Sequence, residues 1–118
     1  MKPRLAHRVL AASGALLGAS GVALSAYSAH GAEAAARANL QPAALFALAH
    51  GIALAALSPH TPRRLGTFAL AMLLLGVLLF SGSLAAAHFF GAPTRLAPIG
   101  GSTIILGWLL FAADALRR

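Results

Sequence analysis

The chain has 118 residues, of which 59% are hydrophobic and only 9% are charged, and it contains no cysteine. An ordinary soluble domain has about 25% charged residues, so this composition excludes a soluble globule and indicates a protein surrounded mostly by lipid. The absence of cysteine excludes disulfides, thiolate catalysis and thiolate metal sites. The formal net charge is +7, but the basic residues stand singly or in pairs between apolar runs. That placement argues against a nucleic-acid-binding surface.

Long apolar segments predict four membrane-spanning helices within a single domain, because about 20 residues at a rise of 1.5 Å cross the hydrocarbon core. The predicted spans cover residues 9–29, 42–58, 66–90 and 99–116. A cleaved signal peptide is the alternative for the first segment, but the segment is longer than the usual apolar region and three more follow. Pro42 is expected at the first helical position of the second span, where its missing N–H costs nothing. A short interfacial helix is expected before it, with Glu33 and Arg37 four residues apart.

The basic residues predict the orientation of the spans. One side of the membrane would carry Lys2, Arg4, Arg8, Arg63, Arg64, Arg117 and Arg118, and the other side would carry Arg37 and Arg95. Short basic loops stay in the cytoplasm, so both termini are expected to be cytoplasmic. Short connections make neighbouring helices antiparallel, which predicts an all-α, integral membrane four-helix bundle. The lack of a long soluble tail or a transit-like segment favours a bacterial inner membrane.

Glycines at helical spacing are expected where helices pack closely. Gly14 and Gly18 are four residues apart, which suits close packing either inside the monomer, the favoured alternative, or in a homodimer. Gly100, Gly107 and Asp114 are spaced by sevens, so they share one face of the fourth helix. Asp114 is expected to pair with Arg117 or Arg118. The residues expected at helix contacts are Gly14, Gly18, Gly82, Gly100, Gly101 and Gly107.

Polar side chains inside a membrane are costly and face the bundle or water, so each is a functional hypothesis. The candidate set is His30, His50, Ser81, Ser83, Ser102 and Thr103. His50 is expected near mid-depth and the others toward the outer side, where they would line one outward-facing polar pocket. The alternative is that the hydroxyls bond to carbonyls of their own helices and that the histidine pairs across a helix interface.

Other sites are disfavoured by spacing. A three-imidazole zinc centre would need His30, His50 and His88, which lie on different spans without close ligand spacing. The Pro98–Gly101 stretch lacks the strand and the Gly-Lys-Ser/Thr ending of a phosphate loop. No nucleophile–base pair or acid pair is visible, so neither an enzyme nor a cofactor is expected. Trp108 lies deeper in its span than an interfacial tryptophan usually does.

Four stretches carry a resemblance to a known family. They are Ala29-His30-Gly31, Ala49-His50-Gly51-Ile52-Ala53-Leu54, Leu79-Phe80-Ser81-Gly82-Ser83-Leu84 and Ala97-Pro98-Ile99-Gly100-Gly101. The chain resembles the domain of unknown function 423 family of small membrane proteins, and it is similar to eukaryotic transmembrane protein 256. The resemblance implies about four membrane helices and brings no established activity. The family tends to place tyrosine and glutamine before the second-span histidine, where Phe46 and Ala47 stand here, so a weaker polar partnership around His50 is expected.

The function expected from these features is a non-enzymatic structural or accessory bundle in the lipid bilayer. It would pack through small residues and associate with itself or with a larger membrane complex, without nucleic acid. The alternative is a small-solute or proton-coupled transporter or channel with an outward-facing pocket around His50, because histidine titrates near neutral pH. Small multidrug transporters have a similar length, but they depend on a carboxylate in the first helix, and residues 9–29 contain none.

Overall fold

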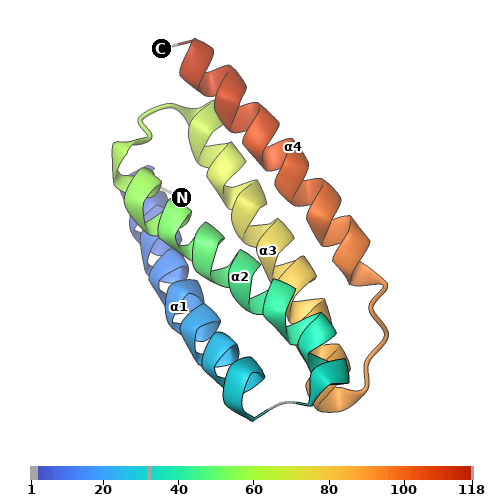
Figure 1. Cartoon of the computed structure of the whole chain (residues 1–118). Helices are drawn as coiled ribbons and strands as arrows, with labels where there is room; N and C mark the ends of the chain where they lie inside the picture. The colour runs from blue at the N-terminus through green and yellow to red at the C-terminus, as the bar shows by residue number, and fades with distance from the viewer. Residues whose placement is uncertain (1–2, 32, 118) are drawn as a thin grey trace.

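The computed structural model describes residues 3–31 and 33–117, so Lys2 and Arg118 from the predicted basic side lie outside the described residues. This part of the chain forms α1 (Pro3–His30), α2 (Ala34–Leu57), the short 3₁₀ helix η1 (Ser58–His60), α3 (Arg64–Phe90) and α4 (Leu96–Leu116), and it contains no strand (Figure 1). Each of the four α-helices is long and apolar enough to cross a membrane. The prediction of an all-α bundle of four such helices is therefore confirmed.

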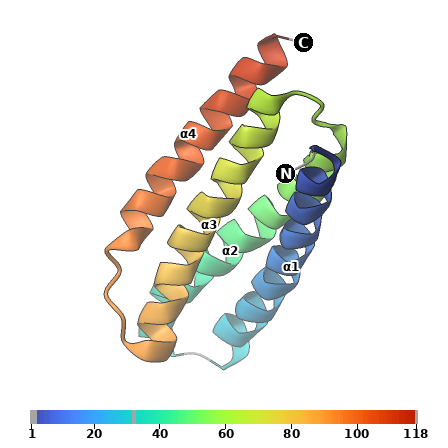
Figure 2. The ribbon, with the colours of Figure 1, turned by 180° about the vertical axis from the view of Figure 1, so that it is seen from behind.

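The helices form two antiparallel hairpins that pack against each other. The first pairs α1 with α2, the second pairs α3 with α4, and the contact between α2 and α3 joins them. Both termini and the α2–α3 connection lie at one end, while the α1–α2 and α3–α4 connections lie at the other (Figures 1 and 2). The long dimension of the bundle is 46 Å, which is close to the thickness of a bilayer with its headgroups, about 40–45 Å.

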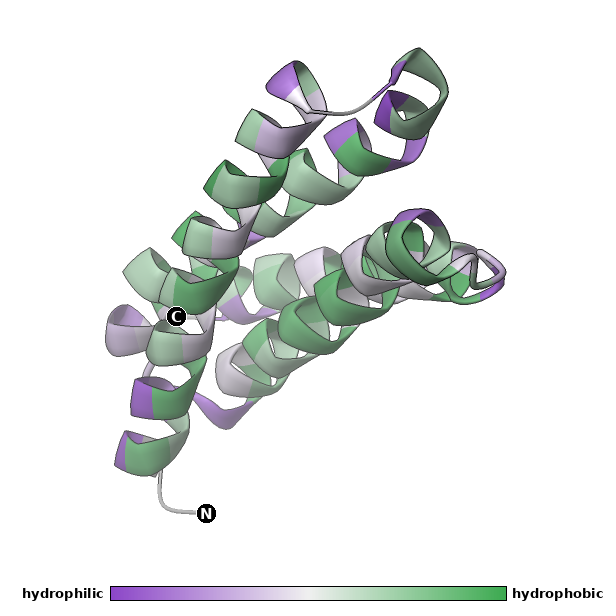
Figure 3. Cartoon of the chain, turned by 90° about the horizontal axis from the view of Figure 1, so that it is seen from below, coloured by the Kyte–Doolittle hydropathy of each residue, from purple (hydrophilic) through white to green (hydrophobic). Residues whose placement is uncertain are grey.

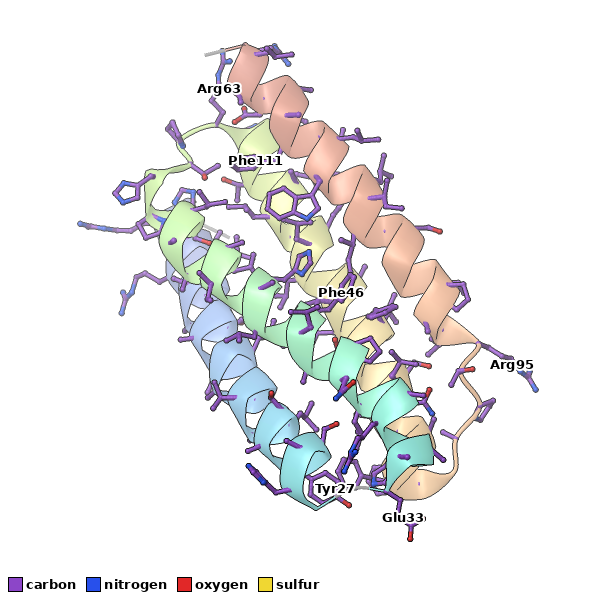
Figure 4. All side chains as sticks on the ribbon, in the orientation of Figure 1. Tyr27, Glu33, Phe46, Arg63, Arg95 and Phe111 are labelled. Atoms are coloured by element: carbon purple, nitrogen blue, oxygen red, sulfur yellow. The ribbon has the colours of Figure 1, made fainter. Side chains whose placement is uncertain are left out.

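Charged residues gather at the two ends. Arg4, Arg8, Arg63, Arg64 and Arg117 lie at the end that carries the termini. Arg37 lies in the first turn of α2 and Arg95 directly before α4, so both belong to the opposite end. Figure 4 shows Arg63 at one end and Glu33 and Arg95 near the other. Hydrophobic residues dominate the helix shafts in between (Figure 3). The basic asymmetry read from the sequence is therefore an asymmetry between the two ends of the folded bundle.

Close backbone contact between glycines holds each hairpin together. A Cβ atom added to Gly14 would lie 2.7 Å from the carbonyl oxygen of Gly51, so α1 and α2 meet at that point. In the second hairpin, a Cβ atom on Gly100 would lie 2.6 Å from the carbonyl oxygen of Gly76. Hydrogen takes the place of a side chain at these crossings, which lets dispersion and weak C–H···O contacts act between the two backbones.

The predicted face of the fourth helix packs on α3. Gly100, Gly107 and Asp114 are all buried. A Cβ atom on Gly107 would lie 2.9 Å from Leu73, and one on Gly66 would lie 2.5 Å from the Asp114 carboxylate. Asp114 is fully buried at the end of this face. The sevenfold spacing thus marks one continuous contact surface.

The other glycines of the predicted set differ in their surroundings. Gly18 lies against α2, because a Cβ atom on Gly51 would be 2.6 Å from the Gly18 amide nitrogen. A Cβ atom on Gly101 would only just reach the Phe80 ring, at 4.0 Å. Gly82 is exposed, and a Cβ atom there would meet nothing within 4 Å. Gly82 therefore makes no close helix contact within the described chain.

The expectation for Pro42 is wrong. The second helix begins at Ala34, so Pro42 lies inside α2 rather than at its first position, and among the described residues no separate interfacial helix stands between α1 and α2. An internal proline leaves one carbonyl of the preceding turn without its usual donor. Tertiary packing outweighs this cost, because Leu40 and Ala43, which flank the proline, are fully buried. Alanine-rich residues 34–41 therefore continue the helix instead of forming a connection.

Candidate functional site: a polar and aromatic contact between α2 and α4

His50 forms the polar centre of the bundle. It lies in α2 with 8% of its surface exposed. The Trp108 indole nitrogen of α4 donates a hydrogen bond to His50 Nε2 at 3.0 Å, and His50 Nδ1 lies 2.9 Å from the Phe46 carbonyl oxygen. An indole N–H can only donate and a carbonyl can only accept, so Nδ1 carries the proton and Nε2 accepts. Both ring nitrogens are satisfied by the neutral tautomer.

Aromatic rings surround this hydrogen-bonded pair. The Phe46 ring stacks on His50, with centroids 5.5 Å apart and planes inclined by 14°. Phe46 also contacts Phe80 of α3 at 4.5 Å, and Trp108 meets Phe111 edge to face at 6.1 Å. Figure 4 shows Phe46 near the middle of the bundle and Phe111 nearer the end that holds Arg63. An apolar surrounding of this kind strengthens the hydrogen bonds inside it.

The contact matters because the backbones of α2 and α4 barely touch. The extensive helix contacts are those of α1 with α2, of α3 with α4 and of α2 with α3. The Trp108–His50 hydrogen bond spans from one hairpin to the other, 58 positions along the chain. It is therefore a direct polar link between α2 and α4.

Ser81 provides a second link between the hairpins. Its hydroxyl donates to the carbonyl oxygen of Ala43 in α2 at 2.8 Å, and the pair is buried. Serine hydroxyls inside helices commonly bond to a carbonyl of their own preceding turn. Ser81 instead bonds across the α2–α3 interface, so its hydrogen bond joins the two hairpins.

The remaining members of the predicted pocket lie elsewhere. His30, the last residue of α1, is exposed. Ser102 donates to the Pro98 carbonyl at 2.9 Å, and Thr103 donates to the Ile99 carbonyl at 2.8 Å, so both bond within α4. Ser83 is buried, and its hydroxyl has no hydrogen-bond partner among the described residues. The structure thus buries His50, Ser81 and Ser83 and does not gather all six residues into one pocket.

The histidines considered for zinc also lie apart. His88 Nε2 is 3.1 Å from the hydroxyl of Tyr27, and Tyr27 lies near the end of the bundle that holds Glu33 (Figure 4). The side chain of His50 bonds to Trp108 and not to His30 or His88. Among the described residues, no group of three His, Asp or Glu side chains is placed to hold a metal ion.

Trp108 is the residue whose role the sequence left open. The alternative that His50 pairs across a helix interface is the one that the structure shows, and its side-chain partner comes from α4. Phe46 contributes its carbonyl oxygen and its ring. A usable signal was present, because an indole N–H deep in a membrane span needs an acceptor. The sequence did not show that His50 was that acceptor.

Comparison with known proteins places this architecture in a family. The family model described as "Protein of unknown function (DUF423)" matches residues 24–101. A "UPF0382 membrane protein" of Haemophilus influenzae is 35% identical over 111 residues, covering 87% of this chain and 90% of the relative. No solved structure matches. The matched region contains His50 and Ser81. The relative is described as a membrane protein, which agrees with the four helices of this chain that are long and apolar enough to cross a membrane. The chain therefore belongs to the DUF423 family of membrane proteins of unknown function.

Proposed function

We propose that this protein is a non-enzymatic structural or accessory bundle of a bacterial inner membrane. The observation that carries the proposal is the closed hydrogen-bonding of His50, whose two ring nitrogens bond to Trp108 and Phe46 within the same chain. A proton carrier or solute-binding group must exchange partners during its cycle. His50 instead joins α4 to α2, and Ser81 joins α3 to α2, which supports a role in holding the bundle together.

The basic end supports a cytoplasmic location for both termini. Arg4, Arg8, Arg63, Arg64 and Arg117 lie at this end, and Arg37 and Arg95 at the other. Arginine and lysine in short loops are retained on the cytoplasmic side during insertion. The protein would then expose the α1–α2 and α3–α4 connections to the periplasm.

The outer helices supply the surfaces for association. In the apolar stretch of each helix, 17% of the residues of α1 and 22% of those of α4 are buried inside the bundle. The corresponding share is 39% in both α2 and α3. Most of α1 and α4 therefore faces outward, toward lipid, a second copy or a larger membrane complex. Exposed small residues of α1 such as Ala15 and Ala19 would permit close helix packing there.

Reconstitution separates this proposal from a proton-coupled transporter. Liposomes with the wild-type protein, an internal pH-sensitive dye and an imposed pH gradient should leak protons no faster than empty liposomes. The His50→Phe variant should leave that rate unchanged and lower stability against unfolding in detergent. Wild-type proton flux that disappears in the His50→Phe variant, while the Ser102→Ala variant retains it, would overturn the structural role. Native mass spectrometry of the same samples measures the oligomeric state.

A further inference from the structure

An apolar groove runs between α1 and α3 at the basic end of the bundle. Its upper part has a volume of about 560 Å³ and is lined by Val9 and Leu10 of α1 and by Phe68, Ala71 and Leu74 of α3. Arg64 and Thr67 line the same hollow at the end of the bundle that carries the termini. The groove thus has apolar walls and a cationic mouth.

A second hollow continues the groove toward the middle of the bundle. It has a volume of about 280 Å³, and it is lined mainly by leucines, Leu16 and Leu17 of α1 and Leu74 and Leu78 of α3, together with Ser13 and Ser20 of α1. Leu74 lines both hollows, so they form one track along the two helices. Leu78 follows Phe68 by ten residues, which is about 15 Å along a helix and about half of the hydrocarbon core. The apolar track matches the depth of one membrane leaflet.

The groove is open because α1 packs mainly on α2 and makes far fewer contacts with α3. In Figure 2, α1 and α3 both face the viewer, with α2 behind and between them. Near the mouth, His7 Nε2 lies 3.0 Å from the Thr67 hydroxyl, and this hydrogen bond ties the two helices together. A direct polar contact therefore joins the two walls of the groove near its mouth.

The exposed charge around the mouth is entirely positive in the described part of the chain. Arg64 lines the groove, and Arg4, Arg8 and Arg63 are exposed at the same end. The chain contains only two acidic residues. Glu33 lies at the opposite end, directly before α2, and Asp114 is fully buried against α3. Basic clusters at the membrane surface attract anionic lipids.

We propose that this groove, which we call the α1–α3 groove, binds an anionic phospholipid, with one acyl chain along Phe68 to Leu78 and the headgroup phosphate at Arg64. The apolar track selects a ligand with a long hydrocarbon chain, and the exposed arginines select a net negative headgroup over a zwitterionic one. The α1–α3 groove lies on a different helix pair from the His50–Trp108 contact. The proposal therefore stands independently of the structural role given above.

Native mass spectrometry of delipidated protein tests the proposal, using equal amounts of phosphatidylglycerol and phosphatidylcholine with identical acyl chains. One phosphatidylglycerol should remain bound in preference to phosphatidylcholine. A juxtamembrane basic residue contributes about 1 kcal/mol to anionic lipid binding, which corresponds to about fivefold. The Arg64→Gln variant should lower the preference by about that factor. The matched Arg95→Gln variant removes an exposed arginine at the opposite end and should leave the preference unchanged.

A second pair of variants tests the acyl-chain track. Ala71→Phe would fill the groove and should remove the bound lipid of either headgroup. Ala113→Phe, at an exposed position of α4, should retain it, with circular dichroism confirming that both variants fold. Inorganic phosphate at millimolar concentration should not displace the lipid. Equal binding of the two lipids, an unchanged preference in Arg64→Gln, full binding in Ala71→Phe, or displacement by inorganic phosphate would each overturn the proposal.

Discussion

The indole N–H of Trp108 donates a hydrogen bond to Nε2 of His50 at 3.0 Å, between two helices whose backbones make few contacts with each other. Because His50 Nδ1 bonds to the Phe46 carbonyl oxygen, the imidazole is held in one tautomer with both nitrogens occupied. A histidine inside an apolar helix is thus explained by the architecture of the bundle, as a bridge between the two hairpins.

Trp108→Phe should destabilise the bundle. The substitution keeps an aromatic ring but removes the indole N–H that bonds to His50 Nε2, and leaving a buried acceptor unsatisfied costs about 1–3 kcal/mol. The free energy of unfolding can be measured by denaturant titration in mixed micelles, followed by far-ultraviolet circular dichroism.

The control for this prediction is a double-mutant cycle with His50→Phe. If the hydrogen bond connects the two residues energetically, the double variant should lose less stability than the sum of the single variants, by about 0.6–1.7 kcal/mol. Strictly additive losses would show that the bond contributes nothing to the stability of the folded bundle.

Ser81→Ala should weaken the contact between α2 and α3. Its hydroxyl donates across the interface to the Ala43 carbonyl, and such a bond contributes about 0.5–1.5 kcal/mol. Ser102→Ala is the matched control, because that hydroxyl bonds only to the Pro98 carbonyl of its own helix and is exposed. Unfolding titrations of the two variants should differ by this amount, and equal stabilities would contradict the assignment.

Gly100→Ala should disrupt the second hairpin. The new methyl group would collide with the backbone of Phe80 and with the Gly76 carbonyl oxygen, so α3 and α4 must separate, at a cost of about 1–3 kcal/mol. Gly82→Ala has open space at the same kind of position, and it should be neutral or stabilising by up to about 1 kcal/mol through helix propensity. Thermal unfolding in detergent compares the two variants. Similar melting temperatures would refute the close approach at Gly100.

The proposed orientation predicts the accessibility of single cysteines. The chain has no cysteine, so His60→Cys and Thr94→Cys each introduce one thiol, at exposed positions at opposite ends of the bundle. In intact cells, a membrane-impermeant maleimide should label Thr94→Cys, and it should label His60→Cys only after lysis. The reverse pattern would place both termini in the periplasm.

Residues of the same type and a similar local sequence can have different partners in this fold. Ser81 and Ser102 both stand in apolar helical runs, yet Ser81 bonds across to α2 while Ser102 bonds to its own helix. Which of these occurs depends on the rotation of each helix about its axis. That rotation follows from contacts with a neighbouring helix, such as those between Gly76 and Gly100, and hydropathy does not encode it.

The sequence by itself determined the number of helices, their alternating direction and the basic character of one end. These properties depend on local hydropathy, because each charged side chain or unpaired backbone group that is placed in lipid raises the free energy separately. The sevenfold spacing of Gly100, Gly107 and Asp114 also identified one buried face before the partner helix was known.

Only the tertiary structure decided which residues meet. Trp108 of α4 contacts His50 of α2, and α2 continues as a helix on both sides of Pro42. The hydroxyls of Ser102 and Thr103 donate to carbonyls of their own helix. Each outcome depends on how two helices cross, and the crossing is set by side chains that lie far apart in the sequence. The α1–α3 groove has the same origin, because it exists where α1 packs on α2 and leaves its contact with α3 incomplete.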